Sequence, residues 1–456
     1  MVDVLYSLVD INERLNQLVF DPFYIHNLDM TMKSSSDDTS SISDQVLNRI
    51  CKNILPRIHH HVNKLTVEPH SLKHILFNGN IYPQLFSLSF INFQEEMLYQ
   101  YLTEDSILHR LLTKQITHLT ICIENDMTPT FSKILSNVFV LILSSCKRLI
   151  NLDFRQLFPN KMMSINTFVQ SSTNCTSLSL TQLKINVKTF DTCLYLLDGR
   201  LRNLSTLIIN VSNISHTLSN TNKMKRLPKL KCFSLISFDD TYHYDDEIIP
   251  LLYRMINLEE LILSLSIIRV DLPYIDGTHL YDEIQMHMPR LNKLIFSINT
   301  AVTKNNININ FPSKEDLQRS FIERGYQQVG VYVDSTETKD EGRCHVYSLP
   351  YQFENFLHLN NSFQGGMFNK VRYLTMTDGR PFEHELFKII SQDFPFLKTL
   401  SICNKEPQKN KQHSSTLITF PHLIALNLTQ AHMIYVFNKR KYFVKLKYID
   451  EADQVK

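Results

Sequence analysis

The 456-residue sequence contains no tryptophan and only nine glycines. Glycine-rich loops bring backbone N–H groups close to phosphates, so this scarcity argues against a nucleotide-binding loop, and neither G-x-G-x-x-G nor G-x-x-x-x-G-K-[ST] occurs. The formal net charge is only +2, so no strong field favours nucleic acid as a partner. With 43% hydrophobic and 20% charged residues, the composition is typical of a folded chain rather than a disordered one.

The sequence also lacks cysteine pairs and long apolar runs. Its eight cysteines form no C-x-x-C motif and are scattered through apolar segments, a usage typical of a reduced cytoplasmic or nuclear protein. The longest apolar run, at 138–143, falls far short of the roughly 20 residues that a membrane span needs. Residues 1–11 lack the basic start of a signal peptide. We therefore expect a cytoplasmic or nuclear protein with no membrane and no nucleic acid among its partners.

The most prominent feature of the sequence is a repeat. The pattern apolar-x-x-Leu-x-apolar recurs at intervals of roughly 26 to 33 residues, close to the 20–29 residues of leucine-rich repeats. Copies begin at Leu85, Ile116, Leu149, Cys175, Leu204, Leu230, Leu258, Leu291, Val371, Leu397 and Leu423.

Each copy predicts one strand, and a segment of helical spacing follows many of them. The period of two places Leu207 and Ile209 on one face and Thr206 and Asn210 on the other. One strand and one helix cannot bury their apolar faces alone, so neighbouring units must stack. We predict an α/β fold, a curved solenoid of irregular leucine-rich repeats with a parallel sheet on the concave side and helices outside. A helical array of armadillo type is the alternative, but it lacks the period-two strand.

Two segments in the second half of the sequence depart from the repeat. Residues 300–370 interrupt it with a polar stretch at 304–312 and a charge run at 334–343, which predict loops, with room for a strand at 328–333 between them. The basic C-terminal stretch, beginning at residue 438, alternates apolar residues with lysines. This pattern predicts a capping strand whose lysine face discourages edge pairing, and a nucleic-acid or nuclear-import patch is the other interpretation.

The N-terminus carries the most specific pattern. Leu5, Leu8, Val9, Leu15 and Leu18 place apolar residues along a predicted helix. Their spacing resembles the second half of an F-box, and the residues that follow are similar to the exit from that motif in F-box proteins with degenerate leucine-rich repeats. A plain amphipathic capping helix is the alternative.

In the F-box family, the F-box binds the Skp adaptor of a cullin-RING ubiquitin ligase, and the repeats present the substrate. The resemblance therefore implies that these five apolar residues contact the adaptor. The Leu-Pro-x-Glu opening and the usual Trp of the motif are missing from this sequence, so we expect weakened binding to the Skp-type adaptor and cullin. The expected function is substrate recognition in an SCF-type ubiquitin ligase. A leucine-rich-repeat interaction scaffold unrelated to ubiquitination is the alternative.

The predicted organisation has four parts: a partial F-box-like helical segment at 1–30, a Ser-rich linker at 31–50, the repeat solenoid at 51–437 with its irregular insert at about 300–370, and the capping strand and tail at 438–456. The residues that flank the inward-pointing leucines are predicted to bind substrate on the concave face. They are Asn151, Asp153, Arg155, Thr206, Asn210, Glu260, Tyr373 and Thr375.

Motifs that could carry catalysis are few. Three adjacent histidines, at 59–61, would point about 100° apart on a helix and cannot converge on one ion. The acidic residues around His243 lack the glycine and the spacing of a calcium loop. His70 and His74 have no glutamate in an H-E-x-x-H arrangement, and no G-x-S-x-G occurs. We therefore predict no catalytic residue, cofactor or metal site, and a protein that is not an enzyme.

Overall fold

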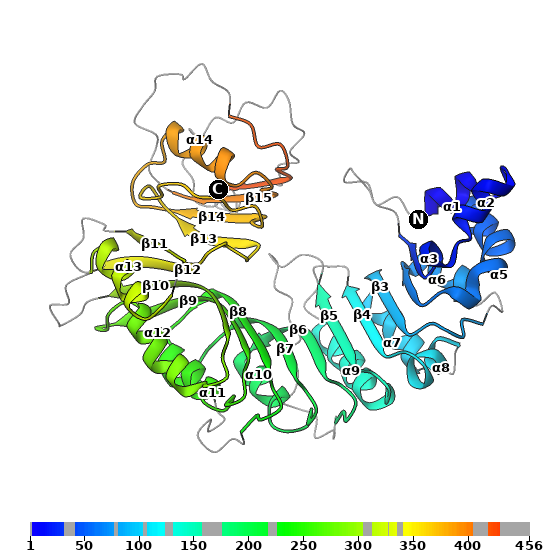
Figure 1. Cartoon of the computed structure of the whole chain (residues 1–456), viewed down its shortest axis with the longest axis horizontal. Coiled ribbons are helices and arrows are strands. Elements are labelled where there is room, and N and C mark those ends of the chain that lie inside the picture. Colours follow the sequence, from blue (N-terminus) through cyan, green and yellow to red (C-terminus); the bar gives the residue numbers. More distant parts are fainter. Residues whose placement is uncertain are drawn as a thin grey trace, which may run out of the picture. The chain divides into compact units, whose positions relative to one another are not determined.

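The structure is a computed structural model. It describes residues 2–31, 42–76, 81–103, 107–123, 131–156, 176–217, 226–303, 312–326, 328–334, 341–404 and 418–428. The chain is an α/β protein with a large, mostly parallel sheet of twelve strands and a second sheet of four (Figure 1). Its residues cluster into two compact units, which are described one at a time. Unit 1 comprises Met1–Leu235 and Arg254–Glu260, and unit 2 comprises Ile236–Tyr253 and Leu261–Lys456.

The first half of the chain alternates helices and strands. Its described elements are α1 (Val2–Leu8), α2 (Glu13–Val19), α3 (Pro22–Ile25), β1 (Asn27–Met30), α4 (Asp44–Arg49), a π-helical turn η1 (Ile50–Ile54), α5 (Leu55–Ile58), a 3-10 turn η2 (His59–His61), β2 (Lys64–Val67), α6 (Pro69–Leu76), β3 (Ser87–Phe93), α7 (Glu95–Thr103), α8 (Ile107–Lys114), β4 (His118–Ile123), α9 (Phe131–Ser145), β5 (Asn151–Gln156), β6 (Gln182–Thr189), α10 (Phe190–Leu196), β7 (Thr206–Asn213) and β8 (Cys232–Thr241).

The second half has longer strands and ends with the second sheet. Its described elements are η4 (Tyr244–Ile248), α11 (Ile249–Leu252), β9 (Glu260–Val270), α12 (Gly277–Glu283), η5 (Gln285–His287), β10 (Lys293–Thr303), α13 (Lys314–Glu323), β11 (Val329–Asp334), β12 (Glu341–Ser348), β13 (Asn355–Leu359), β14 (Tyr373–Thr377), α14 (His384–Asp393), β15 (Thr399–Cys403) and β16 (Ala425–Leu428). Strands β13 to β16 pair in chain order, and all three pairs are parallel.

The core of unit 1 is built from rows of aligned side chains. Strands β1 to β7 pair in parallel and in chain order, and helices lie along one side of them (Figure 1). The register aligns one leucine from each strand, and each is at most 1% exposed. Burying a leucine stabilises a fold by roughly 1.5–3 kcal/mol, so the row is a major source of stability. This leucine row consists of Leu28, Leu65, Leu88, Leu119, Leu152, Leu183 and Leu207.

The strands of unit 1 also begin in the same way. The carbonyl oxygen of Phe86 accepts hydrogen bonds from the N–H groups of Thr117 and His118, at 2.9 and 3.0 Å. The pattern satisfies both N–H groups at the start of each strand, and its recurrence makes consecutive strands structurally equivalent. The carbonyl groups that accept such a pair from the following strand also include those of His26, Asn63, Thr117, Ile150, Thr181, Ser205 and Lys231.

One predicted repeat copy has the wrong register. A copy that began at Cys175, which lies outside the described residues, would bury Leu178, but that side chain is 68% exposed. The strand is β6, and the buried leucine is Leu183. Two overlapping leucine patterns compete in this stretch. The later one also offers Ile185 and Val187, which extend the buried face of β6 with β-branched side chains.

The predicted single N-terminal helix is two helices. Asp10 has a φ of 67°, outside the helical range, and the chain turns there. The Asn12 side chain then caps α2 by accepting a hydrogen bond from the backbone N–H of Leu15 at 2.8 Å. Asparagine is among the best N-cap residues, so the polar residues between the two apolar clusters end one helix and begin the next.

The predicted boundary between an N-terminal segment and the repeats is also wrong. Strand β1 pairs with β2, so residues 1–30 contribute to the sheet of unit 1. The interval 31–50, expected to be a linker, contains helix α4, in which Leu47 is fully buried. Residues 32–41 of that interval lie outside the described residues, as does the predicted capping strand and tail at 438–456.

The interval 300–370 holds more regular structure than predicted. Strand β11 confirms the strand expected at 328–333. The charge run at 334–343 was expected to be a loop, but β12 begins at Glu341 and pairs antiparallel with both β10 and β11. Two cross-strand neighbours therefore satisfy the backbone of β12, and this overrides the low strand propensity of its charged residues. Residues 304–311 and 335–340 lie outside the described part.

Candidate partner-binding surfaces

Six of the eight residues predicted to bind substrate lie on unit 1. They are half-buried and alternate along their strands with fully buried side chains. Successive residues of a strand point to opposite faces, so those on β5 and β7 lie on the face opposite the leucine row. We call this face the polar face. The six residues are Asn151, Asp153, Arg155, Thr206, Asn210 and Glu260.

Strand β5 carries an ion pair on the polar face, formed by Asp153 and Arg155. The Arg155 guanidinium binds the Asp153 carboxylate through two contacts, Nε to Oδ1 at 2.5 Å and Nη2 to Oδ2 at 2.6 Å. Lys184 of β6 is the register partner of Asp153, and Cys122 of β4 is the register partner of Arg155. A paired guanidinium is held in one geometry, so the cluster offers a preorganised charged surface.

The Cys122 thiol lacks the lowered pKa that is typical of a nucleophilic cysteine. Burial raises the pKa of its thiol, and the Asp153 carboxylate raises it further, while Arg155 and Lys184 act in the opposite direction. A reactive cysteine needs a lowered pKa. The same reasoning covers Cys146 and Cys193, where burial raises the thiol pKa to about 12.

Hydrogen bonds between amide side chains tie neighbouring strands of the polar face together. Asn151 donates from Nδ2 to Gln182 Oε1 at 2.7 Å, and Asn210 donates from Nδ2 to Asn186 Oδ1 at 3.0 Å. The Asn210 amide oxygen is buried and accepts no hydrogen bond from the described residues. These bonds fix the orientation of the amides, which lowers the entropy that a partner's binding would cost.

Tyr373 and Thr375 do not continue the rows of unit 1. They lie on β14 in the four-stranded sheet of unit 2, where both are half-buried. Burial raises the pKa of the Tyr373 phenol, Glu354 raises it further, and Arg372 lowers it, so the hydroxyl stays protonated at neutral pH. The eight predicted residues therefore belong to two surfaces, which the sequence pattern alone could not separate.

The five residues predicted to contact an adaptor differ in how far their side chains are buried. Leu5 and Val9 are in the core, Leu8 and Leu15 are half-buried, and only Leu18 is open to solvent, at 54%. An adaptor cannot reach Leu5 or Val9 in this arrangement. The sequence pattern identified the apolar positions but not which of them pack inward.

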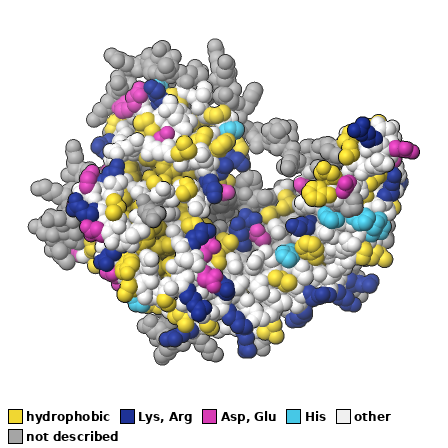
Figure 2. All heavy atoms as spheres, in the orientation of Figure 1, with side chains coloured by type: hydrophobic (Ala, Val, Ile, Leu, Met, Phe, Trp, Pro, Cys, Tyr) yellow, Lys and Arg dark blue, Asp and Glu magenta, His cyan; other side chains and the backbone are white. Residues whose placement is uncertain are grey.

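Other apolar side chains of the same elements are exposed, and Figure 2 shows hydrophobic side chains on the surface over the N-terminal helices. Phe23 of α3 is 81% exposed, and its ring meets that of Tyr24 at 5.5 Å. Contiguous exposed apolar surface is typical of interaction sites. We use the name N-terminal apolar patch for the exposed large apolar side chains of residues 5–25, which are Tyr6, Ile11, Leu18, Phe23 and Tyr24.

Two arginines dock the N-terminal helices onto the rest of unit 1. Arg49 lies over the Tyr6 ring at 4.9 Å and donates to the Val9 carbonyl at 3.2 Å. Arg57 lies over the Phe20 ring at 4.1 Å and pairs with Asp10 at 2.9 Å. These contacts hold the N-terminal helices that carry the patch in a fixed position on unit 1.

The acidic residues around His243 form ion pairs and hydrogen bonds within unit 2. Asp245 pairs with Arg269 at 2.8 Å, and Asp240 accepts a hydrogen bond from Ser266 at 2.5 Å. His243 contacts Asp246 at 2.9 Å. The Asp240 and Asp245 carboxylates are therefore directed at protein donors.

Comparison with known proteins provides no family assignment. No family model matches the chain, and no curated protein matches its sequence. Among the described residues, no helix is long and apolar enough to cross a membrane.

Proposed function

We propose that this chain is the substrate-recognition subunit of an SCF-type cullin-RING ubiquitin ligase, folded as a curved solenoid of irregular leucine-rich repeats. The observation that carries the proposal is the leucine row, with a row of polar residues on the opposite face of strands β2 to β7, namely Lys64, Ser87, His118, Asn151, Gln182 and Thr206. Such alternation is typical of repeat proteins that bind partners on an extended sheet. The substrate would lie on the polar face.

The charged cluster on β5 is the proposed centre of the substrate surface. Arginine is enriched among residues that dominate binding energy, and Arg155 is already held by Asp153. The register partners of this pair are Thr120 and Lys184, beside Asp153, and Cys122, beside Arg155. Mixed polar groups around an arginine favour a protein partner over an apolar ligand.

The N-terminal apolar patch is the proposed adaptor surface. In the F-box family, apolar side chains of short helices contact the adaptor, and here Leu18, Ile11 and Phe23 are the apolar groups open to solvent. Leu5 and Val9 are assigned a supporting role, because they anchor the helices that carry the patch.

Adaptor binding tests the ubiquitin-ligase role. A purified Skp-type adaptor is titrated against the whole chain, the double variant Leu18→Asp/Phe23→Asp, and the control Leu178→Asp. Leu178 is a matched control because it is also a strongly exposed hydrophobic residue of unit 1, at 68%. We expect binding by the unchanged chain and the control, and at least tenfold weaker binding by the double variant. Absence of binding by the unchanged chain would leave the interaction scaffold unrelated to ubiquitination as the better interpretation.

Partner capture tests the polar face separately. The tagged chain is compared with Arg155→Ala/Lys184→Ala, and captured proteins are quantified by mass spectrometry. The control is Lys231→Ala/Glu259→Ala, which removes an exposed ion pair of unit 1. A captured protein that depends on Arg155 and Lys184 but not on the control pair supports the proposed surface. Equal capture by both variants contradicts it.

A further inference from the structure

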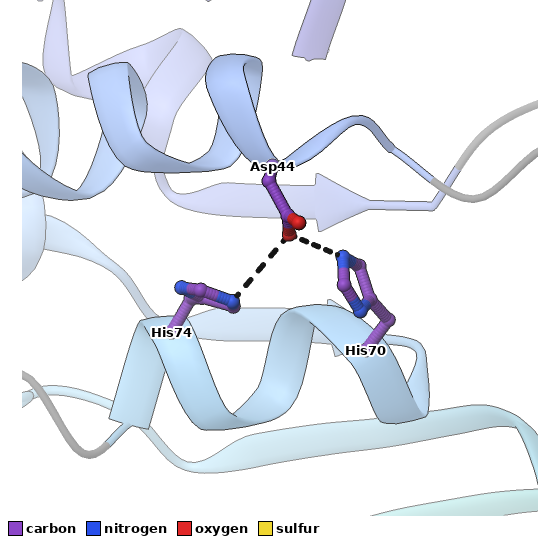
Figure 3. A group of neighbouring side chains, drawn as sticks. All are labelled: Asp44, His70 and His74. Atoms are coloured by element: carbon purple, nitrogen blue, oxygen red, sulfur yellow. Dashed lines mark ion pairs between the residues drawn. The ribbon is translucent and has the colours of Figure 1, made fainter.

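Helices α4 and α6 of unit 1 bring three metal-binding side chains together. His70 and His74 are one turn apart on α6, and Asp44 is the first residue of α4. Figure 3 shows both imidazole rings directed toward the Asp44 carboxylate. We propose that Asp44, His70 and His74 form a zinc site, which the sequence alone did not predict because the aspartate comes from a different helix.

The packing of α6 explains why both histidines are available. Leu72 and Ile75 of this helix are buried, so the outward face carries the imidazoles, whose side chains are 44% and 33% exposed. Residues four apart on a helix lie on the same face. This geometry is the one by which histidines at i and i+4 share a metal ion.

The distances between donor atoms fit a single ion. Asp44 Oδ1 lies 2.9 Å from Nε2 of His70 and 3.9 Å from Nε2 of His74, and all three donor atoms lie within 4.8 Å of one another. Ligands about 2.0–2.1 Å from a tetrahedral zinc are about 3.3 Å apart. The distances from Asp44 Oδ1 to the two Nε2 atoms, 2.9 and 3.9 Å, lie on either side of that value. Side-chain shifts below an ångström would therefore bring these donor atoms to the spacing that a tetrahedral zinc needs.

The donor set favours zinc over a hard cation. Two imidazoles and one carboxylate suit Zn²⁺, whereas Ca²⁺ and Mg²⁺ prefer oxygen donors. Three protein ligands leave the fourth tetrahedral position to water, and the exposed carboxylate, at 69%, leaves room for it. A simple ion pair would need only one imidazole, yet both rings approach the same oxygen, Oδ1.

The affinity of the site for zinc depends on the groups that hold the two imidazole rings in place. In the part of the chain that the structure describes, no hydrogen bond orients the far nitrogen, Nδ1, of either ring. Loss of such an orienting partner typically weakens metal binding about 10- to 100-fold. We therefore expect reversible binding, weaker than in a closed structural zinc site.

Calorimetric titration of the whole chain with ZnCl₂ tests the proposal. The site variants are Asp44→Ala, His70→Ala and His74→Ala, and the matched control is His60→Ala/His61→Ala, which removes two exposed or half-exposed histidines of unit 1 that could also bind zinc. We expect one zinc ion per chain, with affinity at least tenfold weaker in each site variant and unchanged in the control. Circular dichroism without zinc should be the same for all variants, because none of the three side chains is buried in the core: their exposures range from 33% to 69%.

Two results would overturn the proposal. One is a zinc affinity that falls only in the His60/His61 variant, which would place the ion at the histidine tract. The other is the absence of saturable zinc binding by the unchanged chain.

Discussion

Glu95, the first residue of α7, has a carboxyl group whose ionisation should oppose folding. Its side chain is buried, and this burial, together with the charge of Glu96, raises its pKa from 4.5 to about 7, although a hydrogen bond from the Leu135 backbone acts in the opposite direction. Its Oε2 atom has no partner among the described residues. We predict that Glu95→Gln stabilises the protein at neutral to alkaline pH.

The magnitude follows from the two pKa values. Below pH 4.5 the carboxyl group is protonated in both the folded and unfolded states and imposes no cost. As pH rises, the unfolded state ionises first, so the folded state loses about 1.4 kcal/mol for each pH unit until its own group ionises near pH 7. The full cost is about 3 kcal/mol. Glu95→Gln should therefore raise the free energy of unfolding by up to about 3 kcal/mol at pH 8, and by little at pH 4.5.

Urea unfolding followed by circular dichroism between pH 4.5 and pH 9 provides the assay. Glu96→Gln is the matched control, because that neighbouring side chain is exposed. It should lower the pKa of Glu95 in the folded state, so the destabilisation still begins near pH 4.5 but ends at a lower pH and reaches a smaller full cost. An effect of Glu95→Gln that is the same at all pH values would refute ionisation as the cause. No effect at pH 8 would refute the burial argument altogether.

Three further predictions concern packing and capping. Leu207→Ala, in the leucine row, should lower the free energy of unfolding by about 2–5 kcal/mol through lost burial and a residual cavity; an unchanged urea midpoint would contradict its place in the core. Gly277→Ala should destabilise unit 2 by at least about 1–3 kcal/mol, since a Cβ there would lie 2.5 Å from the Phe321 Cα atom, and thermal melting measures this. Asn12→Ala should cost about 1 kcal/mol by removing the cap of α2, while Asn12→Asp should retain most of the stability in the same melt.

The strands that carry strong alternation could be predicted from the sequence. Leu207 and Leu261 are the fourth residues of the copies that begin at Leu204 and Leu258, and both are fully buried, because a period of two identifies which face of a strand is apolar. Helix α10 directly follows strand β6, as expected for a unit of one strand and one helix, and Gly199 has a φ of 105° shortly after it. These features depend on residues close together in the sequence.

Features that depend on distant residues could not be predicted. Strands β1 and β2 have four residues each, too few for alternation to stand out, and only their pairing reveals them. Asp44 meets His70 because two helices pack together, which no local spacing indicates. The division of Tyr373 and Asp153 between two sheets likewise follows from chain topology, while their local patterns are alike.

The regular register of strands β2 to β7 has a consequence for how recognition could change during evolution. Neighbouring strands of a sheet are about 4.8 Å apart, so polar-face residues two strands apart, such as Thr120 and Lys184, are separated by almost 10 Å. Substitutions at that separation usually act independently of each other. Alternate strands can therefore acquire new side chains on the polar face independently of each other, while the leucine on the opposite face of each strand keeps the fold. Neighbouring strands change together where side chains such as Asn151 and Gln182 are hydrogen-bonded.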